Sequence, residues 1–129
     1  MPEAVELDLE RVVCRVADLA EYGSRAFTVG AGAWPLRGFV VRCGNELRGY
    51  VNRCPHAGHP LDLRPHRFLT RDRTMILCSS HGALFEMDAG LCLAGPCAGE
   101  RLQAVPLEVI GAVVLIGADA DIAALTADG

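Results

Sequence analysis

The chain has 129 residues, of which 51% are hydrophobic and 22% are charged, and its formal net charge at pH 7 is -4. A chain of this length buries roughly two-thirds of its unfolded surface, so the composition predicts one folded domain over residues 1–129 and excludes intrinsic disorder. No apolar run approaches the roughly 18 residues that cross a bilayer, and the acidic start has no basic segment followed by an apolar one. We therefore expect a cytoplasmic protein. With no cluster of Lys or Arg, the acidic balance argues against nucleic acid or a membrane as a partner and favours a protein.

Short apolar or alternating runs recur along the chain, rich in β-branched and aromatic residues, and these features predict strands. We expect strands at residues 12–16, 25–29, 38–42, 47–52, 74–78, 83–87, 101–110 and 112–116. Glycine-rich turn sequences separate the runs. The sequence therefore predicts an all-β fold, a small antiparallel sandwich or barrel that offers a rigid platform for loops.

Two regions depart from this simple pattern. Pro106 interrupts the run at 101–110, which predicts an edge strand or two strands joined at a bend. Helical turns are expected only near Asp18 and in the tail from about residue 118, which we expect to fray.

Two short motifs each pair a cysteine with a histidine. One residue separates Cys54 from His56, and two separate Cys78 from His81. A thiolate and an imidazole at this spacing can reach one metal centre, and each pair directly follows a predicted strand that would hold its loop. The stretch 57–77 is long enough for the chain to leave the first loop and return along a strand to the second. The sequence therefore predicts one site with four ligands.

The complete motifs are C-x-H-x-G-x-x-L from Cys54 to Leu61 and C-x-x-H-G-x-x-F from Cys78 to Phe85. They resemble the motifs of the Rieske family, including its small ferredoxins, and the resemblance extends over about residues 14–116. It implies the Rieske 2Fe-2S fold, in which stacked antiparallel β-sheets carry two cluster-binding loops at the tip.

The same resemblance implies a cofactor, one 2Fe-2S cluster per chain. Cys54 and Cys78 would hold one iron, and His56 and His81 would hold the other. Two departures from the family pattern are visible, because Ser79 stands where the family often has proline and the spacer between the motifs is longer than in its commonest members. Neither departure removes a ligand.

Two other interpretations of the four ligands are weaker. A structural Cys2His2 zinc module would use the same atoms, but zinc fingers usually place Cys-x-x-Cys before His-x-x-x-His, whereas here each pair is mixed. A Rieske fold that had lost its cluster would be expected to lack a ligand, and none is missing.

The ligand set also bears on the reduction potential. Two ferric ions, two sulfides and two thiolates sum to zero charge, so reduction is easier than in a four-cysteine cluster, whose potential in plant-type ferredoxins is about -400 mV. High-potential Rieske proteins have a serine and a tyrosine where this chain has Ala83 and Phe85, and a pair of bracing cysteines where it has His59 and Ser80. Without those hydroxyl donors, the resemblance implies a potential toward the roughly -150 mV end of the Rieske range.

Four further cysteines lie outside the motifs. Cys14 and Cys43 fall in or beside predicted strands, and we expect them to be buried thiols. Cys92 and Cys97 are close enough in sequence for a disulfide, although a reducing cytoplasm favours thiols. Between them, Gly95-Pro96 resembles the proline loop that covers the cluster in this family.

Three other side chains have simpler expected roles. His59 is expected beside the cluster and is not expected to be a ligand. His66 lies in a polar stretch and is expected to be a solvated loop residue, and Trp34 is expected at the edge of the core.

The resemblance implies an electron carrier without catalytic residues, most simply the ferredoxin component that donates single electrons to an oxygenase. An oxygenase subunit would need a further domain with a two-histidine, one-carboxylate iron site, and no histidine follows His81. The alternative is a small subunit permanently attached to a reductase, as in assimilatory nitrite reductases. A large chain that co-purifies with the protein would favour that alternative.

Overall fold

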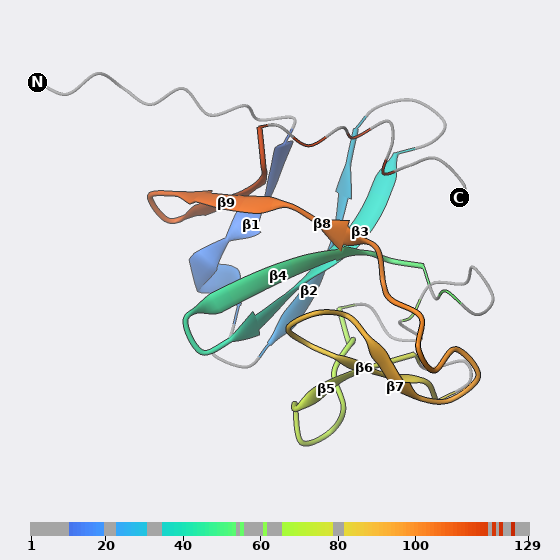
Figure 1. Ribbon diagram of the computed structural model, residues 1–129. Helices are drawn as coiled ribbons and strands as arrows, with labels where there is room; N and C mark the ends of the chain where they lie inside the picture. Colours follow the sequence, from blue (N-terminus) through green and yellow to red (C-terminus); the bar gives the residue numbers. More distant parts are fainter. Residues whose placement is uncertain are drawn as a thin grey trace, which may run out of the picture.

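The computed structural model describes residues 11–19, 23–30, 35–53, 55, 61, 66–78, 82–118, 120, 122 and 125. In this part of the chain, the strands form three antiparallel sheets (Figure 1). The all-β prediction is confirmed.

The middle sheet has the strand order β2-β3-β4-β8. Its strands are β2 (Ser24–Val29), β3 (Leu36–Cys43), β4 (Glu46–Val51) and β8 (Ala104–Val105). The run Phe39, Val40 and Val41 in β3 is buried throughout, because successive side chains point to opposite faces and both faces are covered. Phe39 and Val41 join one hydrophobic core, and Val40 joins the other. The sheet is therefore a middle layer between two cores.

The outer sheet covers the Val40 face of the middle sheet and has the order β1-β10-β9. It consists of β1 (Val12–Arg15), β10 (Val113–Ile116) and β9 (Leu107–Ile110). Pro106 stands between β8, which pairs with β4, and β9, which pairs with β10. The expectation of two strands joined at a bend is confirmed, and the bend is where the chain passes from one sheet to the other.

The third sheet lies at one end of the molecule, at the bottom of Figure 1. It has the order β5-β6-β7, with β5 (Met75–Leu77), β6 (Leu84–Glu86) and β7 (Cys92–Ala94). Strand β7 was not predicted, because its three residues are too few for an alternating pattern. The segment is a strand because it pairs with β6, and the sequence does not show that pairing.

Helical structure is limited in the described residues. The 3-10 helix η2 (Val16–Asp18) confirms the helical turn expected near Asp18. In the tail, Ile122 and Leu125 are in helical conformation. Leu125 is buried in the core between the outer sheet and the middle sheet, which we call the outer core. Among the described residues, no helix is long and apolar enough to cross a membrane.

An aromatic core joins the middle sheet to the third sheet. The ring of Phe39 stacks on Phe68 with a centroid distance of 4.2 Å, and lies 5.7 Å from Tyr50. The buried members of this aromatic core are Phe39, Val41, Tyr50, Leu61, Phe68, Ile76, Cys78, Ala83, Phe85, Met87, Cys92, Cys97 and Leu102. Leu61, at the end of the first predicted ligand loop, and Cys78, the predicted ligand of the second, therefore lie in one core.

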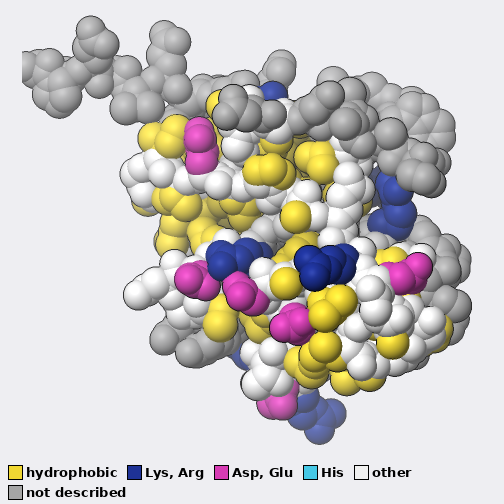
Figure 2. Space-filling model, viewed as in Figure 1, with side chains coloured by type: hydrophobic (Ala, Val, Ile, Leu, Met, Phe, Trp, Pro, Cys, Tyr) yellow, Lys and Arg dark blue, Asp and Glu magenta, His cyan; other side chains and the backbone are white. Residues whose placement is uncertain are grey.

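Polar bonds from β4 fix the third sheet against the middle sheet. The Tyr50 hydroxyl donates to the Met87 carbonyl at 2.7 Å, and burial raises the pKa of Tyr50 to about 12. Arg48 pairs with Asp88 at 2.8 Å and with Glu46 at 3.2 Å. In Figure 2, basic and acidic side chains lie side by side across the middle of this face, with hydrophobic side chains above and below them. These bonds thus join the third sheet to the middle sheet, in addition to the packing of the aromatic core.

Candidate metal centre

Of the four predicted ligands, the structure describes Cys78. Other predicted residues lie outside the described part of the chain: Cys54, His56, His81, His59, Ser79, Ser80 and Trp34. Within the described residues, no three His, Cys, Asp or Glu side chains converge on a metal position. The site is therefore built here from Cys78 and from the residues that hold the two loops at their bases.

Cys78 lies at the base of the second loop, immediately after β5, and its side chain is fully buried. The Cys78 N–H donates to the Ala83 carbonyl at 2.9 Å, and the Gly82 N–H donates to the Cys78 carbonyl at 2.9 Å. Gly82 has a φ of +70°, which glycine adopts without the steric cost that a side chain would bring. These bonds close the loop 78–83 between β5 and β6, so a hydrogen-bonded hairpin positions the Cys78 thiol.

The first loop is also fixed at its base. Asn52 follows β4, and its side-chain oxygen accepts a hydrogen bond from the Leu61 N–H at 2.8 Å. Leu61 is fully buried in the aromatic core, where Cys78 also lies. The residues at the two ends of the first loop, Asn52 and Leu61, are thus joined, and Leu61 packs in the same core as Cys78. Sequence analysis missed this role of Asn52, for which its place just before the Cys54 motif is the available signal.

The segment Gly95-Pro96 packs directly on the second loop. A Cβ atom added to Gly95 would lie 2.8 Å from Ala83 Cα, and Gly95 has a φ of +104°. Both observations require glycine at this position, because a side chain would collide with the loop and strain the backbone. The structure therefore places the predicted proline loop against the hairpin that carries Cys78.

Ala83 and Phe85, which stand where high-potential Rieske proteins have hydroxyl residues, are both fully buried in the aromatic core with Cys78. Neither side chain can donate a hydrogen bond. The surroundings of Cys78 from these two positions are therefore apolar.

The residues present fit a 2Fe-2S cluster. Cys78 is a buried cysteine on a closed loop, and thiolate sulfur is the ligand that iron–sulfur clusters require. The remaining predicted ligands, Cys54, His56 and His81, supply one further thiolate and two imidazoles, the mixed set of a Rieske centre.

The structure separates the expectations for Cys14 and Cys43. Cys14 is buried as expected, and burial raises the pKa of its thiol, with a further rise from Asp18. Cys43 is exposed, so the prediction of a buried thiol is wrong. It is the last residue of β3, at the turn into β4, where the strand extends beyond the layers that cover its centre.

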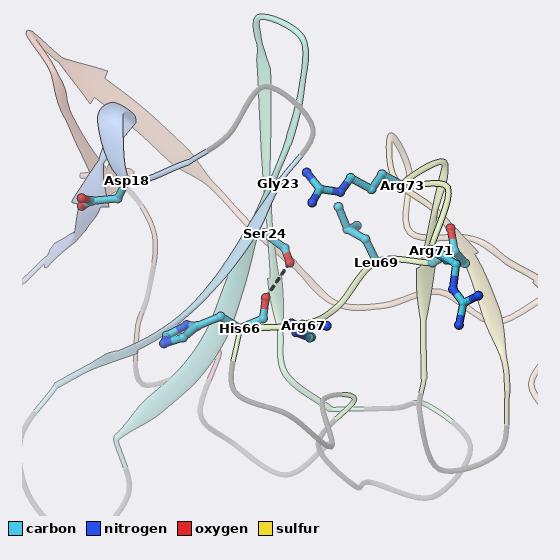
Figure 3. A pocket seen from close by; sticks show the side chains of 9 residues that line it. Asp18, Gly23, Ser24, His66, Arg67, Leu69, Arg71 and Arg73 are labelled. Carbon is cyan, nitrogen blue, oxygen red and sulfur yellow. Dashed lines mark hydrogen bonds between the residues drawn. The ribbon is translucent and has the colours of Figure 1, made fainter.

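His66 is exposed, as expected, but its imidazole is bound. Its Nδ1 accepts a hydrogen bond from the Ala26 N–H at 3.0 Å, and its carbonyl accepts one from the Ser24 hydroxyl at 2.8 Å (Figure 3). The prediction of a solvated loop residue therefore holds for the exposure of His66 but omits its hydrogen bonds to β2. His66 ties the segment leading to β5 to the edge strand β2 of the middle sheet.

A pocket of about 500 Å³ opens beside His66, and its lining includes Arg67, Arg71 and Arg73 as well as Asp18 (Figure 3). The three arginines lie in the segment that leads to β5, and in Figure 3 the Arg71 side chain points away from that of Arg73. This segment precedes β5 and Cys78 follows that strand, so the pocket lies at the opposite end of the strand from the ligand. It is not part of the metal centre.

Comparisons with known proteins agree with this architecture. A family model described as Rieske [2Fe-2S] domain matches residues 10–115. The ferredoxin of carbazole 1,9a-dioxygenase from Nocardioides aromaticivorans IC177 is similar with a TM-score of 0.64 and 26% identity, over 81% of this chain and 93% of that one. A chain in the complex of reduced oxygenase and oxidized ferredoxin in carbazole 1,9a-dioxygenase is similar with a TM-score of 0.62 and 25% identity, over 81% and 89%.

The terminal oxygenase of carbazole 1,9a-dioxygenase from Nocardioides aromaticivorans IC177 has a TM-score of 0.66 at 22% identity, over 85% of this chain but 30% of the oxygenase chain. That likeness concerns the fold alone. A search of curated proteins found no match.

The family match includes both cysteine–histidine motifs and nearly all of the strands. The observed antiparallel sheets, with two loops fixed beside one core, are the fold that the motifs implied. The chain therefore belongs to the Rieske [2Fe-2S] domain family, and it is an electron carrier whose cofactor is a 2Fe-2S cluster.

Proposed function

We propose that this protein is a ferredoxin that donates single electrons to an oxygenase from a low-potential cluster. The observation that carries the proposal is the likeness to the ferredoxin of carbazole 1,9a-dioxygenase, which is 26% identical and is matched over 93% of its length. A chain found in the complex of that oxygenase with its ferredoxin is similar at 25% identity.

The cluster would be held by Cys54 and Cys78 on one iron and by His56 and His81 on the other. When bound, it accepts and releases one electron at a time. The position of Cys78 on a closed, buried hairpin supports this assignment, because such a loop keeps the ligand in place when the charge of the site changes.

The surrounding residues have two tasks, to orient the ligand loops and to limit water. Asn52 holds the end of the first loop, and the contact of Gly95 with Ala83 presses the proline loop on the second. A dry, fixed environment reduces the reorganisation that accompanies electron transfer and tunes the potential. We further infer one domain over residues 1–129 and a cytoplasmic location, supported by the likeness to a dioxygenase ferredoxin over 93% of that chain.

The ligand assignment is tested by chemical analysis of the purified holoprotein. We expect iron and acid-labile sulfide at about two each per chain. Replacing Cys54, His56, Cys78 or His81 singly with alanine should abolish the EPR signal of the reduced cluster, whereas the control His59→Ala should retain it. Zinc without sulfide, or a dispensable His56 together with an essential His59, would refute the assignment.

The role as a transient donor is tested by purification from native cells at low ionic strength, followed by size-exclusion chromatography. A donor that binds its partner briefly should elute without a large chain in fixed proportion. Stoichiometric co-elution with a large reductase chain would contradict the proposal and identify the protein as a permanent subunit.

A further inference from the structure

Two cysteine side chains meet at the loop that packs on the metal centre. Cys92 is the first residue of β7, and Cys97 follows Gly95-Pro96. The Cys97 thiol donates to Cys92 Sγ at a sulfur–sulfur distance of 3.1 Å, and the Cys92 thiol lies 3.3 Å from the Ala94 carbonyl. A disulfide bond has a length of about 2.05 Å, so closure requires the sulfurs to approach by about 1 Å.

The backbone already holds the two residues in a closed turn. The Gly99 N–H donates to the Cys92 carbonyl at 3.0 Å, the Cys92 N–H donates to the Glu100 carbonyl at 2.8 Å, and the Glu100 N–H donates to the Cys97 carbonyl at 2.9 Å. Because these bonds hold the backbone of the turn in place, the remaining approach of the two sulfurs comes from rotation of the two side chains. A disulfide is therefore compatible with the fold as it stands.

The turn is coupled to the second ligand loop. It carries Gly95, whose backbone rests on Ala83, and both cysteines are buried in the aromatic core that contains Cys78. A bond between Cys92 and Cys97 would remove conformational freedom from the segment that covers the loop 78–83. Because of this location, the bond would restrict movement of the segment that packs on the second ligand loop.

Both cysteines are 2% exposed, which favours a small oxidant over a bulky disulfide such as oxidised glutathione. We propose that Cys92 and Cys97 are an oxidation site, which hydrogen peroxide converts to a disulfide that braces the proline loop. One thiol sulfur attacks a peroxide oxygen, the O–O bond breaks, and the products are a sulfenic acid and water. The second thiol then displaces the sulfenic hydroxyl as a second water, so the two sulfurs together lose two electrons to the peroxide.

Peptide mapping of the holoprotein tests the proposal. Peroxide is titrated, excess is removed with catalase, and thiols are alkylated after denaturation. Cleavage after Glu86 and Glu100 releases residues 87–100, which contain Cys92 and Cys97 and no other cysteine. We expect two alkyl labels on this peptide before oxidation, and afterwards an unlabelled peptide that has lost two hydrogen atoms. Visible absorption reports in parallel whether the cluster is intact.

Matched variants identify the bond and its effect. Cys92→Ser and Cys97→Ser should each prevent the crosslinked peptide, whereas Cys43→Ser, at an exposed thiol, should leave it unchanged. Oxidation should raise the unfolding temperature of the wild type by about 5 °C or more and should not raise that of Cys97→Ser. The proposal is overturned if the peptide keeps both labels at doses that oxidise Cys43, or if the crosslink forms only after the cluster has bleached.

Discussion

At the scale of single residues, the side chains that surround the predicted ligand Cys78 include two without a hydroxyl group. Ala83 and Phe85 are buried in the same core and carry no hydroxyl group. A hydroxyl donor to a cluster sulfur stabilises the additional negative charge of the reduced state. Apolar side chains at both positions therefore favour the oxidised state and a low potential.

Restoring the hydroxyl groups should raise the potential. We expect Phe85→Tyr and Ala83→Ser each to shift the midpoint upward by about 60 mV, which corresponds to a tenfold change in a one-electron equilibrium constant. Protein-film voltammetry measures the shift, and Ala104→Ser, at an exposed position of β8, provides the control. Unchanged potentials in both site variants would mean that positions 83 and 85 do not face the cluster sulfurs.

Tyr50 predicts a loss of stability in alkaline solution. Burial raises the folded-state pKa of Tyr50 to about 12 from an ordinary value of 10.0, so the folded protein retains the phenolic proton where the unfolded chain loses it. The stabilisation is complete below pH 10 and is lost as the pH rises through about 12.

Replacing Tyr50 separates this effect from other alkaline changes. Tyr50→Phe should reduce the free energy of unfolding at neutral pH by about 1 to 2 kcal/mol, because the Met87 carbonyl loses its hydrogen bond. Above pH 10 the variant should lose stability less steeply than the wild type. Urea denaturation at both pH values gives the comparison, and equal slopes in the two proteins would exclude Tyr50 as the source.

At the scale of elements, the proline loop contacts the second ligand loop where the backbone of Gly95 lies close to that of Ala83. Gly95 and Gly99 both have positive φ values, but only the added Cβ of Gly95 would meet another residue within 4 Å. The pair therefore allows backbone strain to be distinguished from the contact with Ala83.

Alanine at the two glycines should have different consequences for the cluster. Gly95→Ala should accelerate loss of the visible absorption in the presence of an iron chelator, because the proline loop is forced away from Ala83. Gly99→Ala should cost a similar amount of backbone strain, about 1 to 3 kcal/mol, while the rate of bleaching stays near that of the wild type. Equal bleaching rates in both variants would show that the contact does not protect the cluster.

Sequence reasoning succeeded where the pattern is local and failed where the structure depends on distant contacts. The short apolar or alternating runs of β2, β3, β4 and β10 were identified because β-branched and aromatic residues are concentrated in them. Strand β7 was missed because its order comes from pairing with β6, and the exposure of Cys43 depends on where the covering layers end. The pocket beside His66, which joins the segment before β5 to the start of β2, likewise depends on contacts between distant segments.

The site itself was predictable to a similar depth. The motif spacing predicts Cys54, His56, Cys78 and His81 as ligands, and the assignment stays a prediction because the structure describes Cys78 alone of the four. The bond from Leu61 to Asn52 and the fit of Gly95 on Ala83 could not be predicted, because each joins separate loops through the folded core.

At the scale of the whole molecule, the two cores have separate tasks. The outer core joins β1, β9 and β10 to the middle sheet, and the aromatic core supports the loops of the metal centre. The first loop follows β4 of the middle sheet, and the second joins β5 to β6 of the third sheet, so the aromatic core between the two sheets is a shared base for a carrier that changes charge at each transfer. A carrier of this kind serves an oxygenase only if its potential is low enough to donate.

The midpoint potential of the wild-type holoprotein at neutral pH, measured by protein-film voltammetry, tests this account most directly. Rieske centres extend from about -150 to about +300 mV, and the apolar surroundings of Cys78 predict a value toward the lower end. We expect a one-electron wave near -150 mV. A midpoint above about +100 mV would contradict both the role assigned to Ala83 and Phe85 and the proposal that the protein donates electrons to an oxygenase.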